Sequence, residues 1–392
     1  MSLAEQQDLA AVHADAQALL GAGRPDAAEA LLRPYLAGGH GPLALWRLMA
    51  AALQGQGRFE QVREIRTMLV DTAPGDLAAR YDLAEILLLL GDFARGWREY
   101  RFRYSLPHTK CIARKMPGPR WEGEKLPGRA LFVHDEQGFG DTFQFVRLLR
   151  PAAKRAQAGI VFEVNPESHM LMQRSFPEFE ILPCGALPPP CVAHCELMSL
   201  PMALGLRLED LPGALPYLRP DPARLARWRQ RLSHLPRPLV ALAWAGRPSH
   251  PNDVNRSMAL SALAPLAASG LQFLSLQKGP AAEQALAPPE GLKLEVLSEE
   301  IRDFDDTAAI LCIADLLVSV DSSPVHLAGA LGRPAWVMLP FIPEWRWMLG
   351  SADTPWYPQH RLFRQKCPGD WSGMAAQLVT ALQAWAANPR GT

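Results

Sequence analysis

Residues 316–340 read LLVSVDSSPVHLAGALGRPAWVMLP, and this stretch decides the fold. The apolar run at 316–320 predicts a buried strand, and a second apolar run from residue 335 predicts another. Between them, residues 323–332 have the composition of a helix that ends at a glycine. A strand, a short polar turn, a helix and a second strand form the repeating unit of a parallel α/β sheet.

Four polar side chains follow the first of these strands: Asp321, Ser322, Ser323 and His326. Open α/β sheets bind ligands outside the carboxyl ends of their strands. A helix that begins there directs N–H groups and the positive end of its dipole toward an anion. We therefore predict a phosphate site here. The alternative is an ordinary capped helix in which His326 serves only packing.

The same alternation extends outward from this stretch through most of the chain. Two series of strands and helices follow one another, which predicts a multidomain protein with two Rossmann-like α/β domains and a cleft between them. The predicted parts are helical repeats at 1–106, a linker at 107–128, an N-terminal Rossmann-like domain at 129–220, a C-terminal Rossmann-like domain at 221–375, and a C-terminal helix and tail at 376–392.

The N-terminal part repeats with a period of 34 residues, marked by Gly23, Gly57 and Gly91. Each unit is predicted to be two amphipathic helices with the glycine in the turn. Length, glycine position and small-residue pattern resemble the tetratricopeptide repeat. Such repeats stack and present a surface that binds a peptide or protein. The alternative is a structural cap on the α/β domains.

A second polar turn, HDEQGFGDT at 134–142, follows the first strand of the first series. Gln137, Gly140 and Asp141 lie in it, and Gly140 permits a close approach of the backbone. Asp141 is a candidate functional carboxylate, or simply the cap of the next helix. The turn does not match the GxGxxG pattern, so it does not support nicotinamide binding.

The second series begins with a strand and a polar loop, WAGRPSHPNDVNRSM at 244–258. Arg256 and its neighbour Asn255 suit a phosphate or diphosphate, because arginine offers paired donors. Further residues at strand ends or in the Trp-rich segment are predicted to contact phosphate, base or sugar, with solvated or core positions as the alternative: Trp244, Gln277, Lys278, Trp345 and Arg364.

Composition excludes several classes of protein. Forty basic and forty acidic residues among 392 give a formal net charge of zero, so no overall field attracts nucleic acid or an anionic membrane. No apolar run is long enough to span a bilayer, and we expect a cytoplasmic protein. Cys184, Cys191, His194 and Cys195 lie close in sequence, but reduced thiols are expected there rather than a metal site.

Taken together, the phrases HDEQGFGDT, NDVNRSM, SLQKGP, DFDDTAA and VSVDSSPVHLAGALG resemble glycosyltransferase family 9, the ADP-heptose transferases. The arrangement with repeats resembles bacterial flagellin glycosyltransferases. The resemblance implies a GT-B fold and an inverting mechanism without a cofactor or metal. It also implies that Asp141 deprotonates the acceptor hydroxyl, that Arg256 neutralises the departing phosphate, and that Asp321, Ser322, Ser323 and His326 bind phosphate.

The resemblance also implies a cytoplasmic enzyme that moves a sugar from a nucleotide sugar to a protein held by the repeats, with flagellin as a candidate acceptor. Both ADP-heptose and a CMP-linked nonulosonate remain open as donors. Three alternatives stay open: a transferase acting on a glycan or lipopolysaccharide, a repeat-based adaptor with a degenerate transferase domain, and a sugar-nucleotide epimerase.

Overall fold

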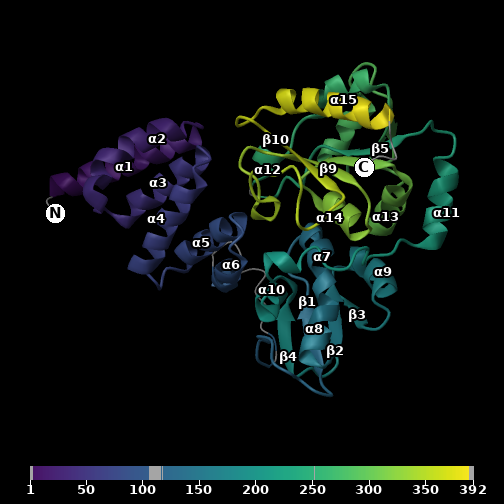
Figure 1. Cartoon of the computed structure of the whole chain (residues 1–392), viewed down its shortest axis with the longest axis horizontal. Helices are drawn as coiled ribbons and strands as arrows, with labels where there is room; N and C mark the ends of the chain where they lie inside the picture. Colours follow the sequence, from purple (N-terminus) through teal and green to yellow (C-terminus); the bar gives the residue numbers. More distant parts are fainter. Residues whose placement is uncertain (1–2, 106–115, 117, 251, 388–392) are drawn as a thin grey trace. The chain divides into compact units, whose positions relative to one another are not determined.

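The computed structural model describes residues 3–105, 116, 118–250 and 252–387 (Figure 1). Residues 107–115 and 117 of the predicted linker, and residues 388–392 of the predicted tail, lie outside the described residues. The chain forms two units. One comprises the described residues of 1–113 together with 342–349, and the other those of 114–341 together with 350–392.

The first unit is helical. Its helices are α1 (Leu3–Gly21), α2 (Pro25–Leu32), α3 (Leu43–Gly55), α4 (Phe59–Thr72), α5 (Leu77–Leu89) and α6 (Phe93–Tyr100), with 3₁₀ segments η1 (Arg33–Gly39) and η2 (Arg101–Ser105). Each helical pair has a glycine in the turn between its two helices. These are Gly23, Gly57 and Gly91, with φ of 68°, 74° and 85°. A side chain disfavours this left-handed conformation, so the repeated glycines set the turn of each hairpin.

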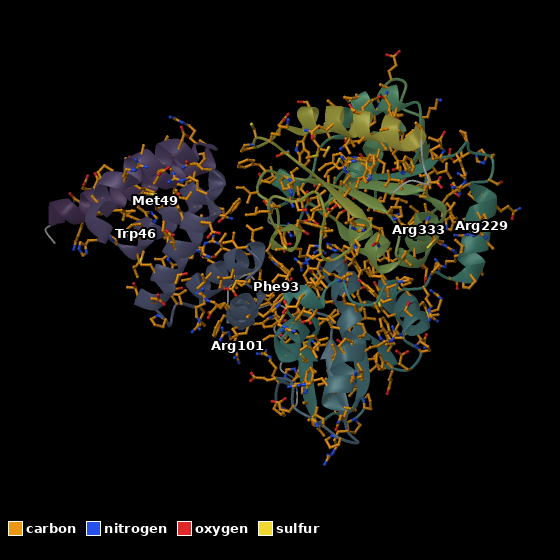
Figure 2. The ribbon with its side chains drawn as sticks, in the orientation of Figure 1. Trp46, Met49, Phe93, Arg101, Arg229 and Arg333 are labelled. Carbon is orange, nitrogen blue, oxygen red and sulfur yellow. The ribbon has the colours of Figure 1, made fainter. Side chains whose placement is uncertain are left out.

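A distant piece of chain completes the core of the helical unit. Residues 342–349, which the sequence assigns to the C-terminal Rossmann-like domain, belong here and contain the short helix η8 (Trp345–Trp347). The Trp345 ring meets the ring of Trp97 edge to face, with centroids 5.3 Å apart. Phe93, which Figure 2 labels, packs against Trp97 of the same helix with 5.4 Å between the ring centroids.

In the second unit, the first sheet contains β1 (Ala130–His134), β2 (Gly159–Val164), β3 (Glu180–Pro183) and β4 (Ala193–Glu196). The strands are parallel in the order β3-β2-β1-β4. The connecting helices are α7 (Phe139–Phe145), α8 (Leu149–Ala156), α9 (Pro166–Ser175) and α10 (Leu200–Leu204), with 3₁₀ segments η3 (Val146–Leu148), η4 (Leu197–Ser199) and η5 (Leu208–Asp210).

The second sheet contains β5 (Leu239–Ala243), β6 (Gln272–Ser275), β7 (Leu294–Val296), β8 (Leu316–Val320), β9 (Ala335–Leu339) and β10 (His360–Arg364). Its parallel strands lie in the order β10-β9-β8-β5-β6-β7. The helices are α11 (Pro222–Arg231), α12 (Asp253–Arg256), α13 (Phe304–Ile313), α14 (Ser323–Ala330) and α15 (Trp371–Ala387), with 3₁₀ segments η6 (Leu260–Ser269) and η7 (Pro280–Leu286).

The strand order of the second sheet is that of a doubly wound Rossmann fold. The chain runs from β5 outward to β7, then returns to the other side of β5 and continues through β8 to β10. The first sheet follows the same rule, with β4 returning to the free side of β1. The predicted fold class is thus confirmed: a helical region followed by two parallel-sheet Rossmann-like domains, the GT-B architecture. Among the described residues, no helix is long and apolar enough to cross a membrane.

Candidate functional site

The switch point of the second sheet lies between β5 and β8, which pair directly. In doubly wound sheets the chain leaves these two strands in opposite directions, which opens a crevice at their carboxyl ends. The loop after β5 leads to Arg256, and β8 leads to α14. The Arg256 Nη1 atom donates a hydrogen bond of 3.1 Å to the Asp321 carbonyl, so its guanidinium lies beside the N-terminus of α14.

A small polar network positions Arg256. Its Nε donates to Asp253 Oδ1 at 3.2 Å, and the same oxygen accepts the Ser257 hydroxyl at 2.8 Å. Gly246 makes room for the guanidinium, because a Cβ atom at residue 246 would lie 2.5 Å from Arg256 Nη2. The predicted arginine is therefore held in one place by a carboxylate on one side and a glycine on the other.

The first turn of α14 offers fewer donors than the sequence suggests. The Ser322 hydroxyl turns back toward β8, where it donates to Val320 O at 3.2 Å and lies 3.1 Å from Ser319 Oγ. Pro324 has no N–H, and the Val325 N–H donates to Ser322 O at 3.0 Å. The Ser322 hydroxyl and the Val325 N–H are therefore both engaged within the protein.

His326 is 5% exposed and packs on the turn of the first domain. Its Nδ1 lies 3.1 Å from the Tyr357 hydroxyl and its Nε2 lies 3.8 Å from Asp321 Oδ1. A Cβ atom on Gly140 would lie 2.9 Å from His326 Cδ2 and 3.7 Å from the Cα of Ser323. The contacts of His326 are thus those of a residue packed between helices. Because Gly140 has no side chain, α7 and α14 can approach closely at this point.

Asp141 lies in the first turn of α7, where its Oδ2 accepts the Gly138 N–H at 3.0 Å. This is the capping contact that the sequence offered as the alternative. The Asp141 carboxylate also acts electrostatically on His250, a residue of the second domain. Burial and the charge of Arg256 lower the pKa of His250, while the carboxylates of Asp321 and Asp141 act in the opposite direction. Arg256, Asp321, Asp141 and Asp253 therefore all act on the His250 imidazole.

Asp135 is a second carboxylate in the same turn, and the sequence did not single it out among the site residues. Burial raises its pKa to about 7, the nearby charge of Asp141 adds to the rise, and the hydrogen bond from Thr142 opposes it. The Thr142 hydroxyl donates to Asp135 Oδ2 at 2.6 Å, and the Glu136 N–H donates to Oδ1 at 3.1 Å. The feature of the sequence that could have identified Asp135 is its position directly after β1.

Three predicted contact residues are engaged in holding the protein together. The Gln277 Oε1 atom accepts hydrogen bonds from the backbone N–H groups of Trp244 and Ala245, both at 2.9 Å. Its Nε2 donates to two backbone carbonyls at 3.0 Å. The Trp244 side chain is fully buried in the core of the second sheet. Lys278 Nζ donates to the carbonyls of Ser298 and Ile301 at 2.6 and 2.9 Å.

The remaining predicted residues make contacts of other kinds. Gln137 and Asn255 are exposed, and Asn255 donates to Asn252 Oδ1 at 2.6 Å. Arg364, at the end of β10, donates to Ser351 O at 3.1 Å, and burial lowers its pKa to about 10. Trp345 is 4% exposed within the helical unit, which leaves little of its ring for stacking on a base or sugar.

The cysteine cluster does not assemble as a set of ligands. Cys195 pairs with Val133 in the sheet, and His194 pairs with Phe132. Successive residues of a strand point to opposite faces, so the His194 and Cys195 side chains diverge. Among the described residues, the group of side chains close enough to hold a metal ion is instead His134, His194 and Glu196.

The fold and the switch-point site thus define a protein with a helical region and two Rossmann-like domains. No protein-family model matches the chain. It is 29% identical over 340 residues to the protein FlbA of Caulobacter vibrioides, a match that covers 81% of this chain. The match spans 57% of FlbA, so the chain corresponds to little more than half of that relative.

Solved structures with a similar fold include the ADP-heptose lipopolysaccharide heptosyltransferase II of E. coli, at 16% identity and a TM-score of 0.49 over 67% of this chain and 100% of that one. A glycosyltransferase family 9 structure from Veillonella parvula has 12% identity and a TM-score of 0.46, covering 68% of this chain and 99% of that one. An O-GlcNAc transferase mutant from Thermobaculum terrenum covers 100% of this chain and 95% of its own, at 13% identity and a TM-score of 0.31. Similarities at this level do not assign a function.

Proposed function

We propose that the protein is a glycosyltransferase that moves a sugar from a nucleotide-sugar donor to a protein hydroxyl, with inversion at the anomeric carbon. The observation that carries this proposal is the position of Arg256. Its guanidinium bonds to the Asp321 carbonyl at the N-terminus of α14, at the switch point of the second sheet. A cation and a helix N-terminus at a strand end are the arrangement that a diphosphate requires.

The donor's diphosphate would lie between Arg256 and the Ser323 amide. As the bond between the anomeric carbon and the phosphate oxygen breaks, its electron pair passes to the diphosphate. Arg256 then faces more negative charge than in the ground state, and interactions of this kind accelerate the reaction itself. The step requires no metal ion, because the guanidinium and the backbone donor supply the positive charge.

Asp141 is our choice for the general base. It would take the proton of the acceptor hydroxyl while the oxygen attacks the anomeric carbon from the face opposite the diphosphate. Support comes from its place in the turn after β1 and from its action on His250 together with Arg256. Asp135 is the competing base, because a carboxylate with a pKa of about 7 is well matched to proton transfer at neutral pH.

The acceptor is proposed to be a protein recruited by the helical repeats, and flagellin is the first acceptor to test. Support comes from the 34-residue spacing of Gly23, Gly57 and Gly91 in three successive helical hairpins. Stacked hairpins of this kind offer a continuous surface to a peptide or protein. A glycan acceptor would require no such surface, and a glycan that is glycosylated in place of protein would overturn this part of the proposal.

A two-stage experiment tests the proposal. Thermal-shift screening with ADP-heptose, a CMP-linked nonulosonate and other nucleotide sugars identifies the donor, since a ligand at 100 times its dissociation constant stabilises the protein by about 2.7 kcal/mol. The transfer assay then compares the wild type with Asp141→Asn and Asp135→Asn. We expect Asp141→Asn to bind the donor and lose turnover.

Each alternative function predicts a different result. An adaptor shows no shift with any nucleotide sugar and keeps its cellular function in Asp141→Asn. An epimerase converts the donor in the absence of any acceptor. Loss of turnover in Asp135→Asn with full turnover in Asp141→Asn would transfer the role of base to Asp135.

A further inference from the structure

A cluster of ligating side chains lies at the switch point of the first sheet. There β1 is flanked by β2 on one side and by the returning strand β4 on the other. His134, the last residue of β1, pairs with Glu196, the last residue of β4. His194 lies two residues before Glu196 and therefore points to the same face of the sheet.

We propose that His134, His194 and Glu196 form a binding site for one divalent transition-metal ion, with Zn²⁺ and Fe²⁺ as the fitting ions. Two imidazoles and one carboxylate are a ligand set that both ions accept, with further positions completed by water or another group. The site is distinct from the proposed donor site, and it does not depend on the proposed function.

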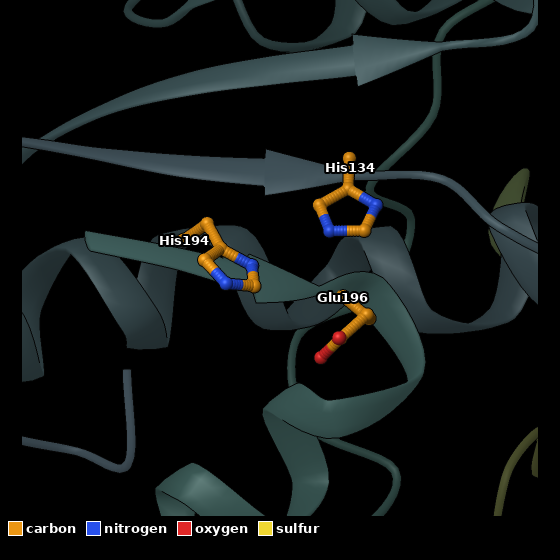
Figure 3. Close-up of side chains that lie close together, drawn as sticks. All are labelled: His134, His194 and Glu196. Atoms are coloured by element: carbon orange, nitrogen blue, oxygen red, sulfur yellow. The ribbon is translucent and has the colours of Figure 1, made fainter. Parts of the chain in front are cut away.

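The geometry carries the proposal. One ligand atom from each of the three side chains lies within 4.8 Å of the other two, and the side chains are 2%, 8% and 5% exposed, respectively. Figure 3 shows the two imidazole rings and the carboxylate gathered at the ends of two neighbouring strands. Three ligating groups therefore meet at one buried place.

Ion binding requires only a small closure of this cluster. An ion about 2.1 Å from each ligand in tetrahedral geometry places the ligand atoms about 3.4 Å apart. Because the present separations are at most 4.8 Å, no pair has to approach by more than about 1.4 Å, which side-chain torsions can supply. Both strands keep their register during such an adjustment, because the ligands share one face of an intact pair.

Arg120 orients the carboxylate. Residue 120 forms a bridge alongside β4, and the Arg120 Nε donates to Glu196 Oε1 at 3.1 Å. Metal-bound carboxylates are commonly held by such an outer hydrogen bond, which fixes their orientation. We assign Glu196 Oε2 as the ligand atom. The nearby guanidinium charge also weakens cation binding, so we expect a lower affinity than a site with an unpaired carboxylate.

The ion would connect β1 to β4 immediately before the turn at residues 135–141. Its expected role is structural: it fixes the point at which the chain leaves β1 and so positions the turn that carries Asp135 and Asp141. This role is compatible with a transfer step in which no metal takes part.

Metal analysis of the full-length protein tests the site. The protein is stripped with a chelator, equilibrated with Zn²⁺ and passed through a desalting column, and the bound metal is counted by mass spectrometry. We expect one Zn²⁺ per chain. The X-ray absorption spectrum at the zinc edge should show nitrogen and oxygen ligands with the scattering pattern of two imidazoles and no sulfur.

Variants locate the ion. His134→Gln and His194→Gln should each weaken Zn²⁺ binding at least about tenfold, because outer-shell changes alone cost that much. His169→Gln is the matched control, since His169 lies in the same domain with its Nε2 3.0 Å from Ile181 O. Cys191→Ser tests the competing cysteine cluster. Both control variants should bind Zn²⁺ like the wild type.

Several outcomes would overturn the proposal. These are the absence of a stoichiometric ion in the wild type, a shell that contains sulfur, and unchanged affinity in either histidine variant. If the histidine variants do not fold, the wild-type spectrum still decides, because fewer than two imidazoles contradicts the site. None of these measurements uses a nucleotide sugar, so the result is independent of whether the transferase proposal holds.

Discussion

Gly246→Ala should disable the protein by displacing Arg256, although residue 246 is not itself a proposed substrate contact. A Cβ atom at residue 246 would lie 2.5 Å from Arg256 Nη2 and 2.7 Å from Asp253 Oδ1. Ordinary contacts begin near 3.5 Å, so the guanidinium must withdraw by about 1 Å. The hydrogen bond from Nη1 to the Asp321 carbonyl, now 3.1 Å, would stretch to about 4 Å and be lost.

A displacement of about 1 Å in a positioned catalytic group can cost about 100-fold in rate. At 1.36 kcal/mol for each factor of ten, this corresponds to about 2.7 kcal/mol of transition-state stabilisation. We therefore expect kcat/KM of Gly246→Ala to fall by about 100-fold, close to the effect of Arg256→Ala. Thermal stability should change far less, because the loop around Arg256 is partly exposed.

The assay measures nucleotide release from the donor identified by thermal shift, in the wild type, in each single variant and in the double variant. Gly159→Ala is the control for the exchange itself, since nothing lies within 4 Å of a Cβ atom there. In the double variant, Gly246→Ala should add no further loss to Arg256→Ala. Wild-type activity in Gly246→Ala, or an additional loss in the double variant, would refute the reasoning.

Three further substitutions test other parts of the structure. Burial raises the pKa of Asp135 to about 7, well above an unfolded value of about 3.9, so the stability of the wild type should fall as pH rises from about 4 to 7. Asp135→Asn should not show this fall. Urea unfolding at pH 5 and pH 8 measures the difference. Gly140→Ala places a Cβ atom 2.9 Å from His326 Cδ2 and should cost about 1–3 kcal/mol in denaturant unfolding, with His326→Ala relieving part of the cost. Trp345→Ala removes a 4% exposed ring from the helical core and should cost about 3–5 kcal/mol, which hydrogen exchange in α6 detects; unchanged protection of α6 would contradict the packing on Trp97.

The parts of the fold that could be predicted are those with strong local periodicity. The strands β5, β8 and β9 are nearly continuous apolar runs, and their burial on both faces produces that pattern. β10 was missed because His360 and two arginines interrupt its apolar residues at the edge of the sheet. β7 has three residues, too few to show a period.

One helical segment takes a form that its sequence pattern does not indicate, for a local reason. Residues 260–269 form the 3₁₀ segment η6 rather than an α-helix, and Pro265 lies within it. Proline cannot donate the backbone hydrogen bond that an α-helix requires at that position. Helical periodicity in sequence does not distinguish these two kinds of helix over such a short stretch.

The candidate site was predictable as a place and less so as a set of atoms. A polar residue after a strand has the same appearance in sequence whether it binds a ligand or satisfies the backbone. Lys278 illustrates this, because its ammonium is held by the carbonyls of Ser298 and Ile301. Ser322 and Ser323 are neighbours of the same type, yet the hydroxyl of Ser322 turns back to β8. Only three-dimensional contacts separate these roles.

The cluster of His134, His194 and Glu196 shows a second limit of prediction from sequence, which concerns residues that are far apart along the chain. In sequence, His194 belongs to a Cys-x-x-His-Cys pattern, and proximity along the chain favours cysteine ligands. The strand alternation directs Cys195 away from His194, while the return of β4 to the side of β1 brings in a residue sixty positions earlier, His134. A ligand set of this kind depends on strand order, which short-range patterns do not encode. Strand order therefore favours one of two metal hypotheses that share the same histidine, and the zinc-edge spectrum tests that choice by the presence or absence of sulfur.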